Sequence, residues 1–331
     1  MIKNQWYGIL DSKELKKNKQ IGVTRLNEKL VLWRDSNGKV NCIADKCCHR
    51  GASISMGKLD ECKDNIACPF HGFAYDGTGK AAYIPANGKN TPVADRYHVK
   101  AFHCDDKYGF IWLWFGEMRE SYPDIPFFEY LRTGFSYGGF SETWSVHYTR
   151  AIENQLDVVH LPFVHATTIG RGNKTLVNGP VVEWKDNLMT FYVDNVLDDG
   201  KTTPLKSEEI KNFRNFFSLQ FQMPNMWQNR ISDDIRIVAV FAPIDSENTH
   251  IYLRFYQRFI KLPILKQLVN YLSNFSNAII LHQDRRVVLK QLPKMTEYKI
   301  NENLIQGDLP IIEYRKRRAE LKVEGEKSDV L

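Results

Sequence analysis

The sequence predicts an α+β protein with two domains, of which the first is all-β and the second combines helices with an antiparallel sheet. Three observations lead to this prediction. Short β-type runs separated by turn residues fill the first third, and longer helical and β-type units follow a proline-containing segment. The length of 331 residues also exceeds the usual size of one domain. We expect the domains to span residues 1–118 and 119–331.

The first domain is predicted from its hairpin patterns. The apolar runs "EKLVLWRD" and "KVNCIAD" flank the turn sequence "SNG", and two more short runs in "FAYDGTGKAAYIP" flank the turn residues Asp76, Gly77 and Gly79. The aromatic run "YGFIWLWFGE" ends near Glu117 and has the composition of a buried strand. These patterns indicate a small domain of antiparallel strands.

The second domain begins after "SYPDIPFF", whose prolines suit a linker. The segment "HYTRAIENQLDVVH" is predicted to be a helix, residues 181–259 have strand patterns with polar turns, and helices resume from about residue 262. The longest apolar stretch, residues 263–281, is interrupted by lysine, glutamine and asparagine. We interpret it as an amphipathic core helix, with interfacial membrane contact as the less favoured alternative.

Composition and charge exclude several classes of protein. A hydrophobic fraction of 43% and only 20 glycines are not typical of disordered, collagen-like or low-complexity chains. The net charge of +6 includes only one short basic run, "YRKRRAELK", which we interpret as a solvated helix, so nucleic-acid binding is not predicted. The N-terminus has no signal-peptide pattern, so we expect a cytoplasmic protein with reduced thiols and no transmembrane segment.

The first candidate metal site lies among clustered cysteines and histidines. Cys47 and His49 form a C-x-H pair, and Cys68 and His71 form a C-x-x-H pair. Zinc is one alternative, but zinc sites usually space two cysteines by a few residues, whereas each pair here mixes a cysteine with a histidine. Such mixed pairs suit a two-iron cluster with both cysteines on one iron and both histidines on the other.

The remaining cysteines of this region are expected to bind no metal. A disulfide between the neighbours Cys47 and Cys48 would be strained, so Cys48 is interpreted as an unligated residue inside the motif. Cys42 and Cys62 are interpreted as small buried hydrophobic residues.

The two pairs resemble the Rieske [2Fe-2S] domain. Its pattern C-x-H-R-G followed by C-P-x-H-G-x-x-Y is matched by residues 47–51 and 68–75. Phe73 departs from the pattern where the family usually has tryptophan, and Cys48 departs where proline is common. The first change should preserve packing, and the second makes the loop less rigid.

The second candidate metal site begins in "ENQLDVVHLPFVH", residues 153–165. Asn154, Asp157 and His160 recur every three residues and would share one face of a helix, although a plain solvated face gives the same pattern. Pro162 disfavours helical geometry before it, so we expect the helix to break after His160. The break would let the imidazoles of His160 and His165 converge on one metal ion.

Asp284 is the candidate third ligand. Its neighbours one helical turn away, among them Leu281 and Val288, are apolar, so its carboxylate would lie on a buried stripe. A buried carboxylate must be paired or bound to metal. The alternative to a metal is a salt bridge to an arginine such as Arg285 or Arg286, which helical spacing makes awkward for those immediate neighbours.

Two histidines and one carboxylate form the facial triad of non-haem iron oxygenases. Together with the N-terminal motif, the triad resembles the catalytic α subunits of Rieske non-haem iron oxygenases over nearly the whole chain. The short single chain is most similar to homotrimeric members such as demethylases and carbazole-type, pheophorbide-type and saxitoxin-pathway oxygenases. This resemblance implies a C-terminal domain of helix-grip (START-like) fold.

The resemblance also implies the chemistry. Cys47, His49, Cys68 and His71 would hold the [2Fe-2S] cluster, and His160, His165 and Asp284 the mononuclear Fe(II). Electrons from NAD(P)H would arrive through a reductase or ferredoxin. With O2 as co-substrate, the chain would hydroxylate or oxidatively dealkylate a medium-sized organic molecule, with monooxygenase or demethylase activity favoured.

Two further residues receive roles from the resemblance. In the family the two metal sites of one chain are too far apart for fast electron transfer. A carboxylate therefore bridges a Rieske histidine of one subunit to an iron histidine of the next. Asp157 matches this carboxylate, and His71 would be the Rieske histidine. Asn154 matches a position near the iron, whereas Glu153 is expected to be structural. Residues 217–228 and the helix face around Asn277 and Leu281 are the expected substrate surroundings.

Two alternative functions remain. One is a pure electron carrier that keeps only the cluster, and the other is a zinc-stabilised binding module. The three residues of the triad argue against both, because neither function needs them.

Overall fold

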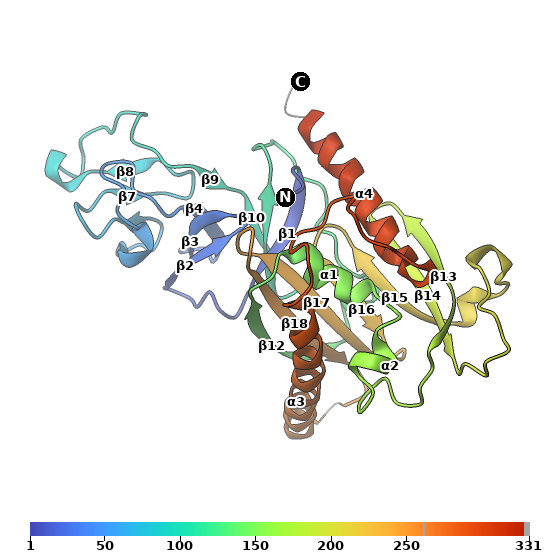
Figure 1. Cartoon of the computed structure of the whole chain (residues 1–331). Helices are drawn as coiled ribbons and strands as arrows, with labels where there is room; N and C mark the ends of the chain where they lie inside the picture. The colour runs from blue at the N-terminus through green and yellow to red at the C-terminus, as the bar shows by residue number, and fades with distance from the viewer. Residues whose placement is uncertain (261, 328–331) are drawn as a thin grey trace. The chain divides into compact units, whose positions relative to one another are not determined.

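The computed structural model describes residues 1–260 and 262–327 (Figure 1). Its chain forms two compact units. The N-terminal unit contains Lys3–Ile125 together with Pro243–Asp245, and the C-terminal unit contains Pro126–Ala242 and the described chain from Ser246 onward. The division after residue 118 stays a prediction about the folding domains, and residues 261 and 328–331 of the second domain lie outside the described residues.

The N-terminal unit consists of three small antiparallel sheets, with strand orders β1-β11-β10, β2-β3-β4-β9 and β5-β6-β7-β8. The strands are β1 (Gln5–Asp11), β2 (Gln20–Arg25), β3 (Glu28–Arg34), β4 (Val40–Ala44), β5 (Lys58–Leu59), β6 (Ile66–Ala67), β7 (Ala74–Tyr75), β8 (Ala81–Tyr83), β9 (Ala101–Phe102), β10 (Cys104–Lys107) and β11 (Phe110–Phe115). The predicted turn joins β3 to β4, where the Asp35 carboxylate accepts the backbone N–H of Lys39 at 2.9 Å and Gly38 has a positive φ of 83°.

Two apolar clusters form the core of this unit. One lies between the first two sheets and contains the buried Cys42, and the other surrounds Cys47 and Cys68. The interpretation of Cys42 as a small buried residue is therefore confirmed. The same interpretation of Cys62 is wrong, because its side chain is exposed in the turn between β5 and β6.

In the described part of the C-terminal unit, seven antiparallel strands form one sheet in the order β12-β18-β17-β16-β15-β14-β13. The strands are β12 (Ser136–Trp144), β13 (Leu176–Lys185), β14 (Leu188–Val196), β15 (Phe217–Gln222), β16 (Met226–Arg230), β17 (Ile235–Pro243) and β18 (Thr249–Gln257). The helices are α1 (Tyr148–Leu156), α2 (Leu161–Val164), α3 (Pro263–Val288) and α4 (Leu309–Lys327). The predicted α+β class with an antiparallel sheet is confirmed.

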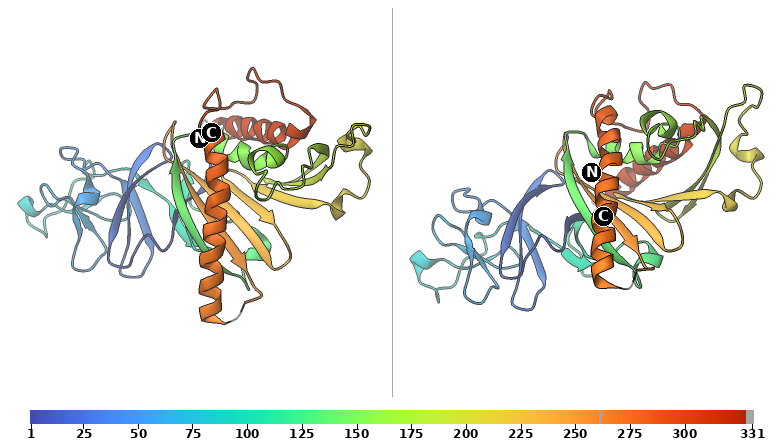
Figure 2. Two further views of the ribbon diagram at one scale, coloured as in Figure 1. Left: turned by 60° about the horizontal axis from the view of Figure 1, so that its bottom comes forward. Right: turned by 90° about the horizontal axis from the view of Figure 1, so that it is seen from below.

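The helices lie along the sheet. The long helix α3 packs on β12 and β18, while α4 packs on β13 and α1 contacts both α3 and α4 (Figure 2). Among the described residues, no helix combines the length and the apolar character that crossing a bilayer requires. The basic segment near the C-terminus forms α4, but it is not simply solvated as expected, because Arg315 and Arg318 are buried.

Candidate functional site

Two loops of similar shape carry the cysteines and histidines of the N-terminal unit. In the first, Gly51 donates its N–H to the Cys47 carbonyl at 2.9 Å, and in the second Gly72 donates to the Cys68 carbonyl at 3.0 Å. Both glycines have positive φ, at 76° and 74°, which other residues rarely adopt. The glycine that closes each motif therefore allows each loop to turn back over its cysteine.

The four candidate cluster ligands form an inner and an outer pair. Cys47 and Cys68 are buried, whereas His49 and His71 are exposed with ring centroids 4.6 Å apart. Burial raises the pKa of the Cys68 thiol, and the neighbouring Cys47 thiol raises it further. Two adjacent buried thiols become thiolates readily only beside a metal ion. The donor set therefore fits a two-iron cluster with sulfur ligands inside and imidazoles outside.

Aromatic side chains support these loops. The Tyr75 hydroxyl lies 3.0 Å from Cys47 Sγ and 3.2 Å from Cys48 Sγ, and it accepts the backbone N–H of Cys48 at 3.2 Å. The Phe73 ring stacks on His49 with centroids 4.8 Å apart and planes 9° from parallel. Phenylalanine thus packs against the histidine at the position where tryptophan is usual.

The second candidate site is built by a chain segment that differs from the prediction. Helix α1 ends at Leu156, because the Asp157 carboxylate accepts the N–H groups of Val159, at 2.7 Å, and His160, at 3.2 Å. The predicted helix through His160 is therefore wrong at its end, and Asn154, Asp157 and His160 do not share one helical face.

Pro162 also acts differently from the prediction. His160 is the N-cap of the short helix α2, and Pro162 lies in its first turn, where a missing N–H is tolerated. His165 follows the end of α2. The ring centroids of His160 and His165 are 5.2 Å apart, so the imidazoles converge as expected although the cause is a new helical turn and not a break.

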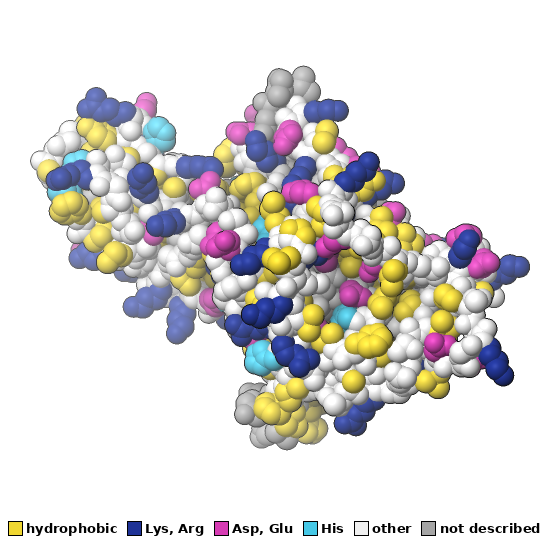
Figure 3. All heavy atoms as spheres, viewed as in Figure 1, with side chains coloured by type: hydrophobic (Ala, Val, Ile, Leu, Met, Phe, Trp, Pro, Cys, Tyr) yellow, Lys and Arg dark blue, Asp and Glu magenta, His cyan; other side chains and the backbone are white. Residues whose placement is uncertain are grey.

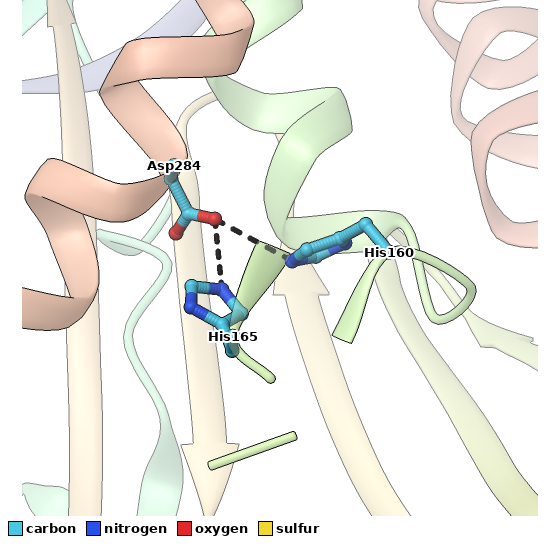
Figure 4. A group of neighbouring side chains, drawn as sticks. All are labelled: His160, His165 and Asp284. Carbon is cyan, nitrogen blue, oxygen red and sulfur yellow. Dashed lines mark ion pairs between the residues drawn. The ribbon is translucent and has the colours of Figure 1, made fainter. Parts of the chain in front are cut away.

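Asp284 of α3 completes a cluster with these histidines (Figure 4). Its Oδ1 lies 2.9 Å from His165 Nε2 and 3.5 Å from His160 Nε2, and one ligand atom from each residue lies within 4.8 Å of the others. Asp284 and His165 are buried, while the His160 side chain is 15% exposed. Among the described residues, no arginine forms an ion pair with Asp284, contrary to the alternative.

The hydrogen bonds of this cluster fit a bound cation. His165 Nδ1 lies 2.8 Å from Gln283 Oε1, and since that oxygen only accepts, Nδ1 carries the proton. When Nε2 carries no proton, the ring presents its lone pair to Asp284 Oδ1, which has no hydrogen-bond partner among the described residues. Two acceptors that face each other at this distance are stabilised by a metal ion between them.

The electrostatics of the site agree with a shared cation. Burial opposes a charge on His160, yet the carboxylates of Asp157 and Asp284 raise its pKa to about 9. Burial likewise opposes charge on Asp284, but the two imidazoles hold the pKa of that carboxyl below its usual value. The carboxylate of Asp284 therefore stays charged inside the protein.

A cavity of about 780 Å³ opens onto this cluster. Asn154, Asn277 and Leu281 line it, together with Phe217, Leu219 and Trp227 from the segment that the sequence analysis selected. The remaining lining residues of the sheet were not predicted, and they include Val193, Asn195, Asn229, Ile237 and Leu253. Glu153 points elsewhere, since it pairs with Arg315 at 2.7 Å.

The surface of the molecule carries no single basic field on the face that Figure 3 shows. Lysine and arginine side chains there lie in several separate groups, with acidic side chains between them. This distribution agrees with the mild net charge of the sequence.

Family models match both units. Residues 5–103 match the Rieske [2Fe-2S] domain, and residues 144–324, more than half of the chain, match the vanillate O-demethylase oxygenase C-terminal domain. Chlorophyllide a oxygenase of Chlamydomonas reinhardtii is 34% identical over 52% of this chain and 26% of its own length. The vanillate O-demethylase oxygenase subunit of a Pseudomonas species is 32% identical over 59% of this chain and 54% of its own length.

Other relatives match over nearly the whole chain. Methylxanthine N1-demethylase NdmA of Pseudomonas putida is 26% identical over 97% of this chain and 89% of its own length. The solved structure of NdmA superposes with a TM-score of 0.78 at 23% identity and covers 98% of this chain and 92% of that protein. Dicamba monooxygenase bound to dicamba superposes with a TM-score of 0.70 at 19% identity, over 97% and 98% of the two chains. These superpositions show that the fold is shared.

Proposed function

This chain belongs to the Rieske oxygenases that carry the vanillate O-demethylase oxygenase C-terminal domain, and from that premise we propose that it is the catalytic subunit of a monooxygenase or demethylase. Its substrate would be a medium-sized organic molecule, which is hydroxylated or oxidatively dealkylated. The observation that supports this proposal most is the arrangement of His160, His165 and Asp284 at a cavity, with acceptor atoms turned toward one another. An electron carrier would need neither the triad nor the cavity.

We assign the candidate ligands accordingly. Cys47, His49, Cys68 and His71 would hold the [2Fe-2S] cluster, and the triad would hold Fe(II). When bound, these groups supply single-electron transfer and activation of dioxygen. The chain itself orients His165 through Gln283, keeps Asp284 ionised by means of the two imidazoles, and encloses the substrate next to them.

The partners follow from the same proposal. A reductase or ferredoxin would deliver electrons from NAD(P)H, and the chains would assemble as a homotrimer in the cytoplasm. Asp157 is partly exposed and lies with Oδ2 3.6 Å from His160 Nδ1. It would then connect this histidine to His71 of a neighbouring chain. Asn154 would lie at the substrate, and its Nδ2 is buried without a partner among the described residues.

Metal analysis and oxygen uptake test this function. A [2Fe-2S] cluster contains equal numbers of iron and acid-labile sulfide. The purified protein should therefore contain one iron per chain in addition to the iron of its cluster. Supplied with electrons and O2, it should consume oxygen only when a substrate from a panel of aromatic, alkaloid, terpenoid and polyketide molecules is present, and mass spectrometry should show gain of oxygen or loss of methyl. Iron and sulfide in cluster proportion would indicate an electron carrier, and zinc without sulfide a structural site.

A further inference from the structure

We propose that Cys48, a thiol outside the candidate ligand set, raises the reduction potential of the [2Fe-2S] cluster by strengthening a hydrogen bond from Tyr75 to Cys47. This inference rests on the proposed function, because it takes Cys47 as a ligand of the cluster. It goes beyond that function in giving a role to a side chain that the catalytic proposal leaves unused. The three residues meet at one atom, the hydroxyl oxygen of Tyr75.

The Tyr75 hydroxyl lies between a buried sulfur and an exposed one. The tyrosine side chain is buried in β7 and belongs to the same apolar core as Cys47. Its oxygen is 3.0 Å from the buried Cys47 Sγ and 3.2 Å from the exposed Cys48 Sγ. It also accepts the backbone N–H of Cys48 at 3.2 Å. One hydroxyl therefore contacts both neighbouring cysteines.

The number of available protons decides which group donates. A cysteine that holds iron is a thiolate, so Cys47 Sγ only accepts, and the single proton of the Tyr75 hydroxyl goes to this charged acceptor. The hydroxyl oxygen keeps two lone pairs, of which the Cys48 N–H occupies one and the Cys48 S–H the other. The hydrogen bonds then run in one direction, from Cys48 through Tyr75 to Cys47.

This direction stabilises negative charge on Cys47 Sγ. Hydrogen bonds to the sulfur ligands of an iron–sulfur cluster help to set its reduction potential, and they favour the reduced state because that state is more negative. A donor to the hydroxyl oxygen polarises the hydroxyl and makes it a better donor in turn. Proline, which is common at position 48 in the family, has neither an N–H nor an S–H to offer. Cys48 thus acts on the cluster through Tyr75.

The midpoint potential of the cluster tests the proposal. It is measured on the purified protein by a redox titration without O2, followed by the visible absorption of the cluster. Cys48→Ala and the bulkier Cys48→Val both remove the S–H and keep the backbone N–H. Each should favour the oxidised state about threefold, which lowers the potential by about 28 mV. Cys48→Ser keeps a donor and should retain the potential of the unaltered protein.

A double variant shows whether Cys48 acts through Tyr75. Tyr75→Phe removes the connecting hydroxyl and should favour the oxidised state about tenfold, or about 59 mV. Cys48→Ala added to Tyr75→Phe should cause no further shift. Cys62→Ala removes the other exposed thiol of this unit and should leave the potential unchanged. Iron and acid-labile sulfide content verifies that each variant holds its cluster.

Several results would contradict the proposal. A potential that rises in Cys48→Ala would mean that Tyr75 donates to Cys48, and an unchanged potential would mean that the thiol has no influence. A shift that persists in the Tyr75→Phe background would show that Cys48 acts without the hydroxyl. Each of these results would leave the proposed function intact. Absence of a [2Fe-2S] absorption from the unaltered protein would instead overturn the proposed function together with this inference.

Discussion

At the scale of single residues, Gln283 is the side chain that determines how His165 is presented. Its Oε1 lies 2.8 Å from His165 Nδ1 and accepts the Thr168 hydroxyl at 2.9 Å. A hydrogen bond to one ring nitrogen fixes the tautomer and leaves the other nitrogen available to a metal. Gln283 therefore supports a candidate metal ligand that lies 118 residues earlier in the chain.

The first prediction concerns this contact. Gln283→Leu removes the acceptor for His165 and should weaken iron binding about 10–100-fold, as measured by competition with a chelator. Gln283→Glu keeps an acceptor and should retain tight binding. Arg286→Gln, an exposed change on the same helix, is the control. Equal iron affinity of the leucine variant and the unaltered protein would contradict the role of Gln283.

The second prediction concerns Asp157. In Asp157→Asn the side-chain oxygen can still accept the Val159 N–H, so the loop and both metal sites should stay intact. The loss of charge should slow product formation about 10–100-fold, because Asp157 is proposed to orient His160 and to connect the two metal centres. Iron and sulfide content verifies loading, and unchanged turnover would remove the bridge from the proposal.

The residues found by sequence analysis differ from those it missed in a physical way. Cys47, His49, Cys68 and His71 combine donor types with short spacing, so local sequence is enough to indicate their chemistry. Gln283 has no such pattern, since a glutamine beside Asp284 on a helix is ordinary. Only the packing of α2 against α3 reveals its contact with His165.

At the scale of elements, a buried ion network connects α1 to α4. Arg315 of α4 donates to both oxygens of Glu153 on α1, from Nε at 2.8 Å and from Nη2 at 2.7 Å, and Arg150 of α1 pairs with Glu302 at 2.6 Å. The side chains of Glu153 and Arg315 are 5% and 3% exposed. The basic segment seemed solvated from its sequence because its acidic partner lies 162 residues away.

The third prediction follows from this network. Arg315→Met leaves the Glu153 carboxylate buried and short of its partner, which should lower the free energy of unfolding by about 3–5 kcal/mol. Arg317→Met on the same helix removes pairs with the exposed Glu320 and Glu324 and hydrogen bonds to Asn187, and should cost less, about 1–2 kcal/mol. Urea denaturation measures both, and equal losses would contradict a special role for the buried pair.

The fourth prediction concerns the start of α1. The His147 side chain caps this helix by accepting the Thr149 N–H, and burial, assisted by Arg318, lowers the pKa of His147 to about 4. In the unfolded chain the pKa is about 6.5, so the unfolded state binds the proton first as the pH falls. As the pH falls from 6.5 to about 4, His147 should therefore lower the free energy of unfolding progressively, by about 3 kcal/mol in total.

The control for this prediction is His147→Asn, which keeps a capping oxygen but does not titrate. Its urea midpoint should fall less steeply over the same pH range than that of the unaltered protein. Parallel pH profiles for the two proteins would show that His147 does not contribute to the acid sensitivity.

At the scale of the whole molecule, sequence patterns predict the class of each unit but not its topology. Alternating and aromatic runs identified the strands, since each strand depends on local periodicity. The order of the large sheet depends on contacts that no local pattern encodes: β12 pairs with β18, as in the register of Ser136 with Gln257. That pairing brings residues far apart in sequence together, and with β13–β17 it forms the sheet that provides one wall of the cavity.

The cooperation proposed between chains is testable by complementation. Cys68→Ser should lose the cluster and keep the iron, and His165→Ala should lose the iron and keep the cluster, so neither variant alone should form product. If electrons pass from the cluster of one chain to the iron of the next, coexpression of both variants should restore activity.

Random assembly of equal amounts into a head-to-tail ring places an intact cluster beside an intact iron site at about a quarter of the interfaces. Coexpressed protein should therefore reach about a quarter of the activity of the unaltered protein per chain, provided that both variants assemble equally. Proteins mixed after assembly serve as the control, since slow exchange should leave them inactive. Coexpressed protein with no more activity than its parents, despite mixed assemblies by native mass spectrometry, would mean that each chain must carry both of its own centres.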